Sequence, residues 1–203
     1  MKQNKILLSL LCLLLIFQSC KQKEKETIVD EHTLPSAATE VSDLSIYNLE
    51  STWKTQDNKS IQFKDLNGKV LVVVMIYTTC KSACPRLVAD MKSLAAKVGD
   101  TQNPIQYVLV SIDPKTDTPE RFKQFAKDND MTDSKWLFLT GDDASTREFA
   151  NVVAMKYASI SPIDFSHSNI ISVFNAQGEL AHQMEGLAVD NSETVAIIKS
   201  LAE

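Results

Sequence analysis

Apolar residues follow two different spacings along the chain from about Leu44 onward. Residues 69–77, KVLVVVMIY, form an unbroken apolar run after a turn at Asn67 and Gly68, which predicts a strand buried on both faces. The next apolar positions recur at helical spacing, with charged residues on the opposite face: Leu87, Val88, Met91, Leu94, Ala95 and Val98. The pattern therefore predicts a central strand that leads into an amphipathic helix.

The rest of the chain repeats this alternation. Further strands are predicted over 106–112, 136–139, 170–174 and 180–184, the last two joined as a hairpin by a turn at 175–178. This arrangement, with the helices between the strands, predicts an α/β domain of about 160 residues over 44–203. The order β-α-β-α-β-α-β-β-α is the one that a thioredoxin-like fold with additions would give, with a central mixed sheet flanked by helices.

Capping residues define where the later helices begin. Thr118 followed by Pro119 is typical of a helix start, with Phe122, Phe125 and Ala126 on the buried side. Ser145 and Glu148 fit a capping box for the next helix, which should direct Phe149, Val152 and Val153 inward. The last helix is predicted around Val195, Ile198 and Leu201.

The N-terminal segment has the pattern of an export signal. Lys2 and Lys5 precede an apolar stretch over 6–17, which as a helix spans only about 18 Å and is too short to cross a bilayer. Ser19 and Cys20 follow and resemble a bacterial lipobox, although Phe17 stands where Leu is usual. We therefore expect a lipoprotein signal peptide over 1–19 and an acylated Cys20. A plain secretory signal with an incidental Cys20 is the alternative.

Residues 20–43 have the composition of a flexible tether. They contain no Phe, Tyr or Trp, so they cannot bury enough apolar area to offset the entropy lost on ordering. The expected product is an exported domain that is anchored by lipid to a bacterial membrane on its extracytoplasmic side.

Composition and charge exclude several classes of protein. The chain of 203 residues is 44% hydrophobic and 23% charged, as is usual for globular proteins. Its formal net charge of −5 becomes −7 once the signal with its two lysines is removed, and the basic residues are scattered. Neither nucleic-acid binding nor electrostatic attachment to a membrane is expected from this distribution.

Two cysteines carry the candidate chemistry. Cys12 would leave with the signal and Cys20 would be acylated, so Cys80 and Cys84 remain, which excludes a four-thiolate zinc or iron–sulfur site. They lie in TTCKSACP between the central strand and its helix, where Ser82 is predicted to cap the helix. The helix dipole should lower the pKa of Cys84 in the opening turn. A structural disulfide is the alternative, although so short a loop adds at most about 2 kcal/mol.

A third ligand would distinguish a metal site from a simple redox pair. His167 lies in the polar segment SPIDFSHSN, is expected in a loop, and is as readily structural as functional from the pattern alone. His32 in the tether and His182 in a strand are expected to have no ligand role, and the dispersed methionines are expected in the core. Two thiolates and an imidazole suit Cu(I) or Zn, and the exported, tethered setting favours copper.

Four segments together resemble the Sco/SenC family of copper chaperones. They are CKSACP at 80–85, VSIDPKTDTPE at 110–120, WLFLTG at 136–141, and His167 before an apolar strand. The resemblance implies a thioredoxin fold, with a copper ion held by Cys80, Cys84 and His167. It places Asp113 near the site without a ligand role. Many members have an acidic residue directly before the histidine, and Ser166 stands there in this chain, so a carboxylate that orients His167 is not predicted.

The same resemblance implies a role in maturing the binuclear copper site of cytochrome c oxidase. The implied partners are a copper donor protein and the copper-bearing subunit of the oxidase. The leading hypothesis is a metallochaperone that passes copper on by ligand exchange. The alternatives are a thiol–disulfide oxidoreductase that reduces the oxidase cysteines, a peroxide-reducing thioredoxin relative, and a redox sensor that acts through a partner.

Overall fold

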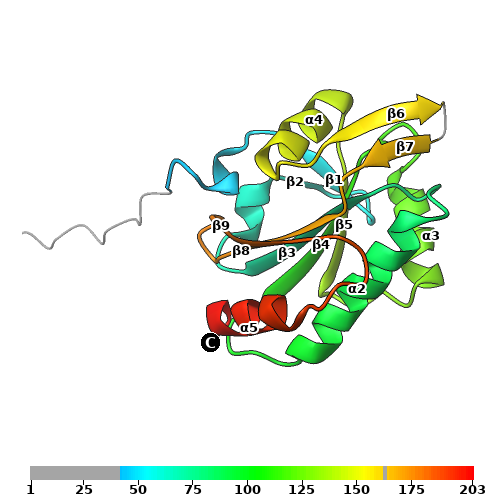
Figure 1. Cartoon of the computed structure of the whole chain (residues 1–203). Helices are drawn as coiled ribbons and strands as arrows, with labels where there is room; N and C mark the ends of the chain where they lie inside the picture. The colour runs from blue at the N-terminus through cyan, green and yellow to red at the C-terminus, as the bar shows by residue number, and fades with distance from the viewer. Residues whose placement is uncertain (1–41, 162–163) are drawn as a thin grey trace, which may run out of the picture. The chain divides into compact units, whose positions relative to one another are not determined.

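The computed structural model describes residues 42–161 and 164–203 (Figure 1). The strands are β1 Trp53–Thr55, β2 Ser60–Ile61, β3 Val70–Ile76, β4 Ile105–Ser111, β5 Trp136–Thr140, β6 Tyr157–Ser161, β7 Asp164–His167, β8 Ile170–Phe174 and β9 Leu180–Glu185. The helices are α2 Ala83–Val98, α3 Pro119–Asp128, α4 Asp143–Val152 and α5 Ser192–Leu201, with short 3-10 turns η1 Ile46–Asn48 and η2 Phe63–Leu66.

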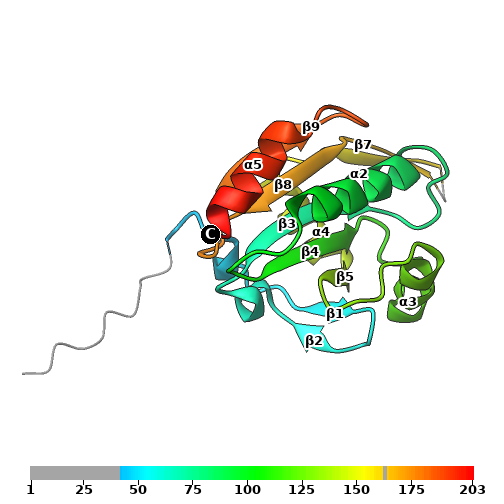
Figure 2. The same ribbon diagram turned by 90° about the horizontal axis from the view of Figure 1, so that it is seen from below.

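Seven of the strands form one mixed sheet, in the order β2-β1-β5-β4-β3-β8-β9. Strand β3 pairs in parallel with β4, and β4 in parallel with β5, whereas β8 runs antiparallel to β3. Helices α2 and α5 lie side by side on one face of this sheet, and α4 lies on the other (Figures 1 and 2). The predicted α/β class, with a thioredoxin-like mixed sheet between helices, is confirmed.

The core is built around β3, as its unbroken apolar run predicts. No residue of this strand is more than 3% exposed. The face covered by α4 carries an aromatic cluster in which Phe63 stacks on Phe149 at 4.5 Å between ring centroids, with Trp53 edge-on to both. The predicted core methionines are all buried: Met75, Met91, Met131, Met155 and Met184. Burial of both faces explains why β3 needs no alternation of polar residues.

The start and end of α4 differ from the sequence prediction. The capping residue is Asp142, whose carboxylate accepts the main-chain N–H of Ser145 at 2.7 Å, so the predicted capping box at Ser145 is wrong. A carboxylate at this position competes well for the first free N–H groups of the helix. Because the helix ends at Val152, that side chain is 41% exposed, and of the two adjacent valines only Val153 packs inward.

Four short strands are absent from the prediction. Strands β1 and β2 have only three and two residues, which is too short for a periodic pattern to emerge. Strands β6 and β7 form a separate two-stranded antiparallel sheet, whereas the sequence predicts a loop over the segment with β7 and no element over β6. Most residues of this hairpin are exposed or half-buried, so it lacks the apolar alternation that identifies a strand.

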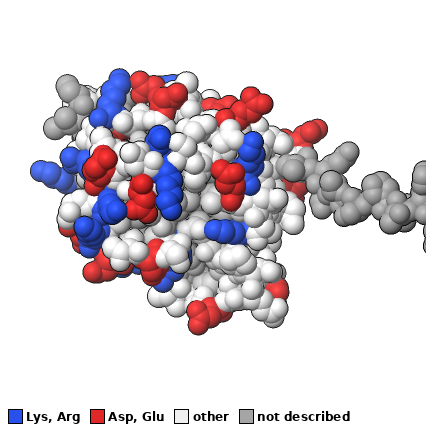
Figure 3. All heavy atoms as spheres, turned by 180° about the vertical axis from the view of Figure 1, so that it is seen from behind, with Lys and Arg blue, Asp and Glu red and all other residues white. Residues whose placement is uncertain are grey.

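The predicted signal peptide, Cys20, His32 and nearly all of the tether over 20–43 lie outside the described residues. Within the described part of the chain, no helix is both long and apolar enough to span a membrane. Basic and acidic side chains are interspersed over the face of the domain seen in Figure 3.

Candidate metal centre

The candidate site lies where β3 leads into α2. Cys80 is in the connecting loop and is partly exposed, whereas Cys84 is the second residue of α2 and is only 1% exposed. Both thiols are free. The carboxyl end of a strand in an open α/β sheet, next to a helix N-terminus, is a usual place for ligands to bind.

The sulfur of Cys80 acts as the acceptor at the start of α2. The main-chain N–H of Cys84 donates to the Cys80 Sγ at 3.3 Å. Ser82 occupies the predicted cap position, but its side chain makes no capping hydrogen bond, and its hydroxyl lies 3.9 Å from the Cys80 Sγ. The first N–H groups of a helix lack partners within it, so the sulfur takes the place that a capping oxygen usually fills.

The two cysteines have opposite ionisation preferences. Burial by itself acts to raise the pKa of Cys80, but hydrogen bonds from the main-chain N–H groups of Cys84 and Ser82 outweigh it and lower the pKa to about 6. Burial raises the pKa of the Cys84 thiol, and the nearby charge of Cys80 adds to the effect. The prediction that the helix start lowers the pKa of Cys84 is therefore wrong, because the free N–H groups point at Cys80 and Cys84 faces the core.

The fold brings His167 to these sulfurs from 83 positions away in the sequence. Its Nε2 lies 3.9 Å from the Cys84 Sγ, and the donor atoms of Cys80, Cys84 and His167 all lie within 4.8 Å of one another. Thiolate and imidazole ligands lie roughly 2.0–2.3 Å from a bound ion such as zinc, so two ligands of one ion are at most about 4.6 Å apart. The three donors need only a small contraction to hold a single ion.

His167 is held on a strand and not in a loop, which corrects the sequence prediction. It is the last residue of β7, and it pairs with Tyr157 of β6. Its Nδ1 lies 3.0 Å from the carbonyl oxygen of Ser168. Because a carbonyl only accepts, this contact requires the proton on Nδ1 and leaves the Nε2 lone pair directed at the sulfurs. The neighbouring Ser166 is exposed, so a main-chain carbonyl orients the ring in place of the acidic neighbour.

A buried carboxylate supports the loop in front of Cys80, and the sequence prediction did not assign it. Asp117 is fully buried and accepts the main-chain N–H of Thr78 at 3.1 Å and the hydroxyl of Ser111 at 2.7 Å. Burial raises its pKa, although these hydrogen bonds oppose the shift. Asp113, which was expected near the site, is buried beside Ser111. In the sequence only the motif DPKTDTPE points to Asp117, and a single sequence does not show which of its two aspartates supports the loop before Cys80.

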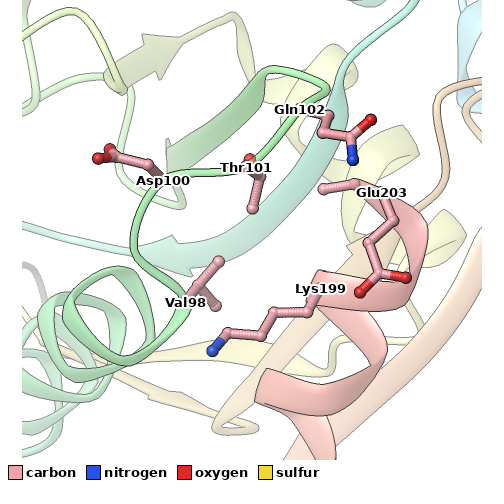
Figure 4. Close-up of a pocket in the computed structure, with 7 residues that line it drawn as sticks. Val98, Asp100, Thr101, Gln102, Lys199 and Glu203 are labelled. Atoms are coloured by element: carbon pink, nitrogen blue, oxygen red, sulfur yellow. The ribbon is translucent and has the colours of Figure 1, made fainter.

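The other candidate residues lie apart from this cluster. The Nε2 of His182 is 3.0 Å from the hydroxyl of Thr194, as expected for a structural histidine. Among the described residues, Cys80, Cys84 and His167 form the one group with metal-ligand geometry. A surface cleft at the other end of α2, where Lys199 of α5 extends toward Val98, lies roughly 20 Å along the helix from Cys84 (Figure 4). That cleft therefore contributes nothing to the candidate site.

Comparison with known proteins identifies relatives over most of the domain. The SCO1/SenC family model matches residues 47–203. The SCO1 protein homolog of Bacillus subtilis (strain 168) is 32% identical over 100 residues, which cover 49% of this chain and 52% of that protein. A SCO2-like protein of Rickettsia typhi is also matched over 56% of its length. The chain thus spans only about half the length of these two curated relatives.

Solved structures with the same fold cover more of the chain. The SCO1/SenC family lipoprotein from Bacillus anthracis str. Ames is 26% identical, with a TM-score of 0.67 over 78% of this chain and 96% of that one. Arabidopsis thaliana ScoI, solved with copper bound, is 18% identical, with a TM-score of 0.65 over 74% and 94% of the two chains. At this lower identity the likeness concerns the fold alone.

Proposed function

The chain belongs to the SCO1/SenC family, and on that premise we propose that it binds one copper ion through Cys80, Cys84 and His167 and delivers it to the copper site of cytochrome c oxidase. A copper donor protein would supply the ion, and the copper-bearing subunit of the oxidase would receive it. The observation that carries the proposal is the convergence of two sulfurs and one imidazole nitrogen within 4.8 Å.

The donor set supports copper as the cargo. Thiolate sulfur and imidazole nitrogen are soft ligands that suit Cu(I) and zinc. Copper is favoured over zinc because a relative with this fold, Arabidopsis ScoI, was solved with copper bound. Three protein ligands also leave a coordination position open, which a ligand from an acceptor protein can occupy during transfer.

The ionisation of the two thiols determines how the ion would enter. Cys80 is already a thiolate at neutral pH and is the more exposed of the two sulfurs, so it would contact the ion first. The buried Cys84 holds its proton, which must leave when its sulfur becomes a ligand. Copper binding would therefore release close to one proton per ion at neutral pH.

Copper titration of the reduced protein tests the proposal. We expect one ion per chain, loss of high-affinity binding in Cys80→Ser and Cys84→Ser, and an affinity at least about tenfold lower in His167→Ala. His182→Ala is the matched control, because that imidazole is bonded to Thr194 and should leave the affinity unchanged. Unaltered affinity in His167→Ala would remove His167 from the site.

A second candidate function, thiol–disulfide exchange, is favoured by the asymmetry of the two thiols. The Cys80 thiolate would attack a substrate disulfide and form a mixed disulfide, releasing one substrate thiolate. Cys84 would lose its proton and displace the second substrate thiolate, which leaves a reduced substrate and a Cys80–Cys84 disulfide. Disulfide reduction by metal-free His167→Ala protein would support this activity, whereas a requirement for copper and for His167 would support the chaperone.

The proposal extends to location. Residues 1–19 would be a lipoprotein signal, and acylated Cys20 would anchor the domain through the tether at the extracytoplasmic face of a bacterial membrane. The pattern of Lys2, the apolar stretch and Ser19-Cys20 supports this location, as does the family lipoprotein from Bacillus anthracis.

A further inference from the structure

Tyr77 links the loop that carries the cysteines to the strand that carries His167. It follows β3 directly, three positions before Cys80, and its side chain is buried. Its ring lies edge-on to the His167 ring, with 5.7 Å between centroids and an angle of 82° between planes. It also lies edge-on to the Phe165 ring at 5.1 Å. The aromatic face of β7 therefore packs directly on Tyr77.

The phenol of Tyr77 is hydrogen-bonded to the first residues of β7, at the opposite end of that strand from His167. It donates to the carboxylate of Asp164, the first residue of β7. Its oxygen also accepts the main-chain N–H of Phe165 at 3.3 Å. A phenol has one donor and two acceptor lone pairs, and this hydroxyl also forms a hydrogen bond with the side chain of Cys80. Tyr77 thus contacts β7 at its first residue through the hydroxyl and at its last residue through the ring.

Strand β7 needs such a side-chain attachment because it is not part of the main sheet. The ladder of hydrogen bonds that fixes the seven strands does not include β6 and β7, which pair only with each other among the described strands. Only Ser168 and Asn169 join His167 to β8, so the chain itself fixes the C-terminal end of β7. The N-terminal end of β7 lies further from that link, and there Tyr77 makes both polar and aromatic contacts between the two sheets.

We infer that Tyr77 is a positioning residue, which uses its hydrogen bond to Asp164 to hold β7 in the place that brings the His167 imidazole to the cysteine sulfurs. The inference rests on the proposed function for its consequence in copper binding, but the positioning itself concerns the metal-free protein. It also gives this chain a carboxylate that supports the histidine: Asp164 acts through the phenol of Tyr77, whereas the residue directly before His167 is the neutral, exposed Ser166.

The Tyr77→Phe variant removes the hydroxyl and keeps the ring that packs on Phe165 and His167. In the metal-free protein, we expect the nuclear Overhauser contact between the His167 ring and the Cys84 side chain to be lost or strongly weakened. In the reduced protein, we expect copper affinity to fall about tenfold, at the lower end of the effect of removing partners that orient a metal ligand. Asp164→Asn should act in the same direction, because a neutral amide is a weaker acceptor for the phenol.

Tyr47→Phe is the matched control. That phenol is also buried and donates to a main-chain carbonyl, that of Leu66 at 3.3 Å, but it belongs to η1, outside the candidate site. It should leave both the Overhauser contact and the copper affinity unchanged. Circular dichroism of each variant checks that the fold is retained.

A double-mutant cycle separates positioning from general stability. In the His167→Ala background, Tyr77→Phe should lower copper affinity much less, because the ligand that it positions is absent and only its hydrogen bond to Cys80 is lost. An equal loss in both backgrounds, or an Overhauser contact that survives in Tyr77→Phe, would overturn the inference. A third outcome separates the two proposals. If the wild-type protein shows the Overhauser contact but binds no copper, and Tyr77→Phe loses the contact, the proposed function is overturned and the positioning role stands.

Discussion

The main-chain N–H of Cys84 donates to the Sγ of Cys80 at 3.3 Å, so one cysteine of the pair stabilises the thiolate of the other. The same contact orders the start of α2. The different pKa values of the two thiols therefore come from hydrogen bonds to Cys80 at the helix start and from the burial of Cys84.

Thiol reactivity should depend on pH differently at the two positions. With a pKa of about 6, Cys80 changes from mostly thiol to mostly thiolate between roughly pH 5 and pH 7, so its alkylation rate should rise over that interval and then level off. Cys84 should react slowly throughout, because burial raises its pKa and blocks access. Timed alkylation followed by mass spectrometry of the two peptides measures both rates.

The unfolded protein provides the control for that experiment. In denaturant both thiols should ionise near the ordinary value of about 8.5 and react alike. Equal labelling of Cys80 and Cys84 in the folded protein at pH 7 would contradict the assignment of Cys80 as the thiolate.

The carboxylate of Asp117 should contribute to stability through the loop before Cys80. In Asp117→Asn, one oxygen becomes an NH2 group that cannot accept from Thr78 or Ser111, so a buried hydrogen bond is lost. We expect the free energy of unfolding to fall by about 1–3 kcal/mol, measured by urea denaturation. Asp128→Asn on the exposed face of α3 is the control and should change stability by less than about 0.5 kcal/mol. Equal stability of the two variants would contradict this role.

Gly178 should be required where the β8–β9 turn meets the N-terminal end of the domain. Its φ is +79°, and an added Cβ would lie 2.6 Å from the Ser45 Oγ and 2.8 Å from the Tyr47 ring. Gly99 also has a positive φ, +69°, with a ψ of −151° and open space around it, so Gly99→Ala measures a cost of backbone strain without crowding, about 1–3 kcal/mol. Gly178→Ala should cost a further 1–3 kcal/mol or so from crowding. Chemical denaturation of both variants gives the difference, and equal losses would show that the turn can move away.

Acylation of Cys20 is testable with a second cysteine as its control. In a bacterial host, Cys20→Ser should no longer be recovered in the membrane fraction. Mass spectrometry of its mature N-terminus should no longer show the added mass of the lipid. Cys12→Ser lies in the predicted signal, which is removed, and should change neither result. Membrane association that persists in Cys20→Ser would favour the plain secretory signal, with some other means of attachment.

The sequence was most informative where one residue type dominates a whole element. The apolar run of β3, the amphipathic spacing of α2 and the Thr118 cap of α3 were all predicted close to their observed bounds. The hairpin β6–β7 was missed because it has little apolar alternation and depends on contacts with Tyr77 that are remote in sequence.

The candidate site shows the same division. Cys80 and Cys84 could be found from their spacing and from the elements on either side, and His167 from its polar surroundings and the family motif. The pKa values could not be assigned correctly, because they depend on which sulfur faces the free N–H groups and which faces the core. The support from Asp117 and Tyr77 also depends on tertiary contacts across 39 and 87 positions.

The division of the ligands between two sheets has a consequence for the order of events in the proposed transfer. Both sulfurs follow β3 of the large sheet, whereas the imidazole ends a separate ribbon. If the chain transfers copper as proposed, an acceptor ligand would replace the imidazole nitrogen first, while the two sulfurs keep hold of the ion. The exchange would then proceed one ligand at a time, and the buried core around β3 would stay intact.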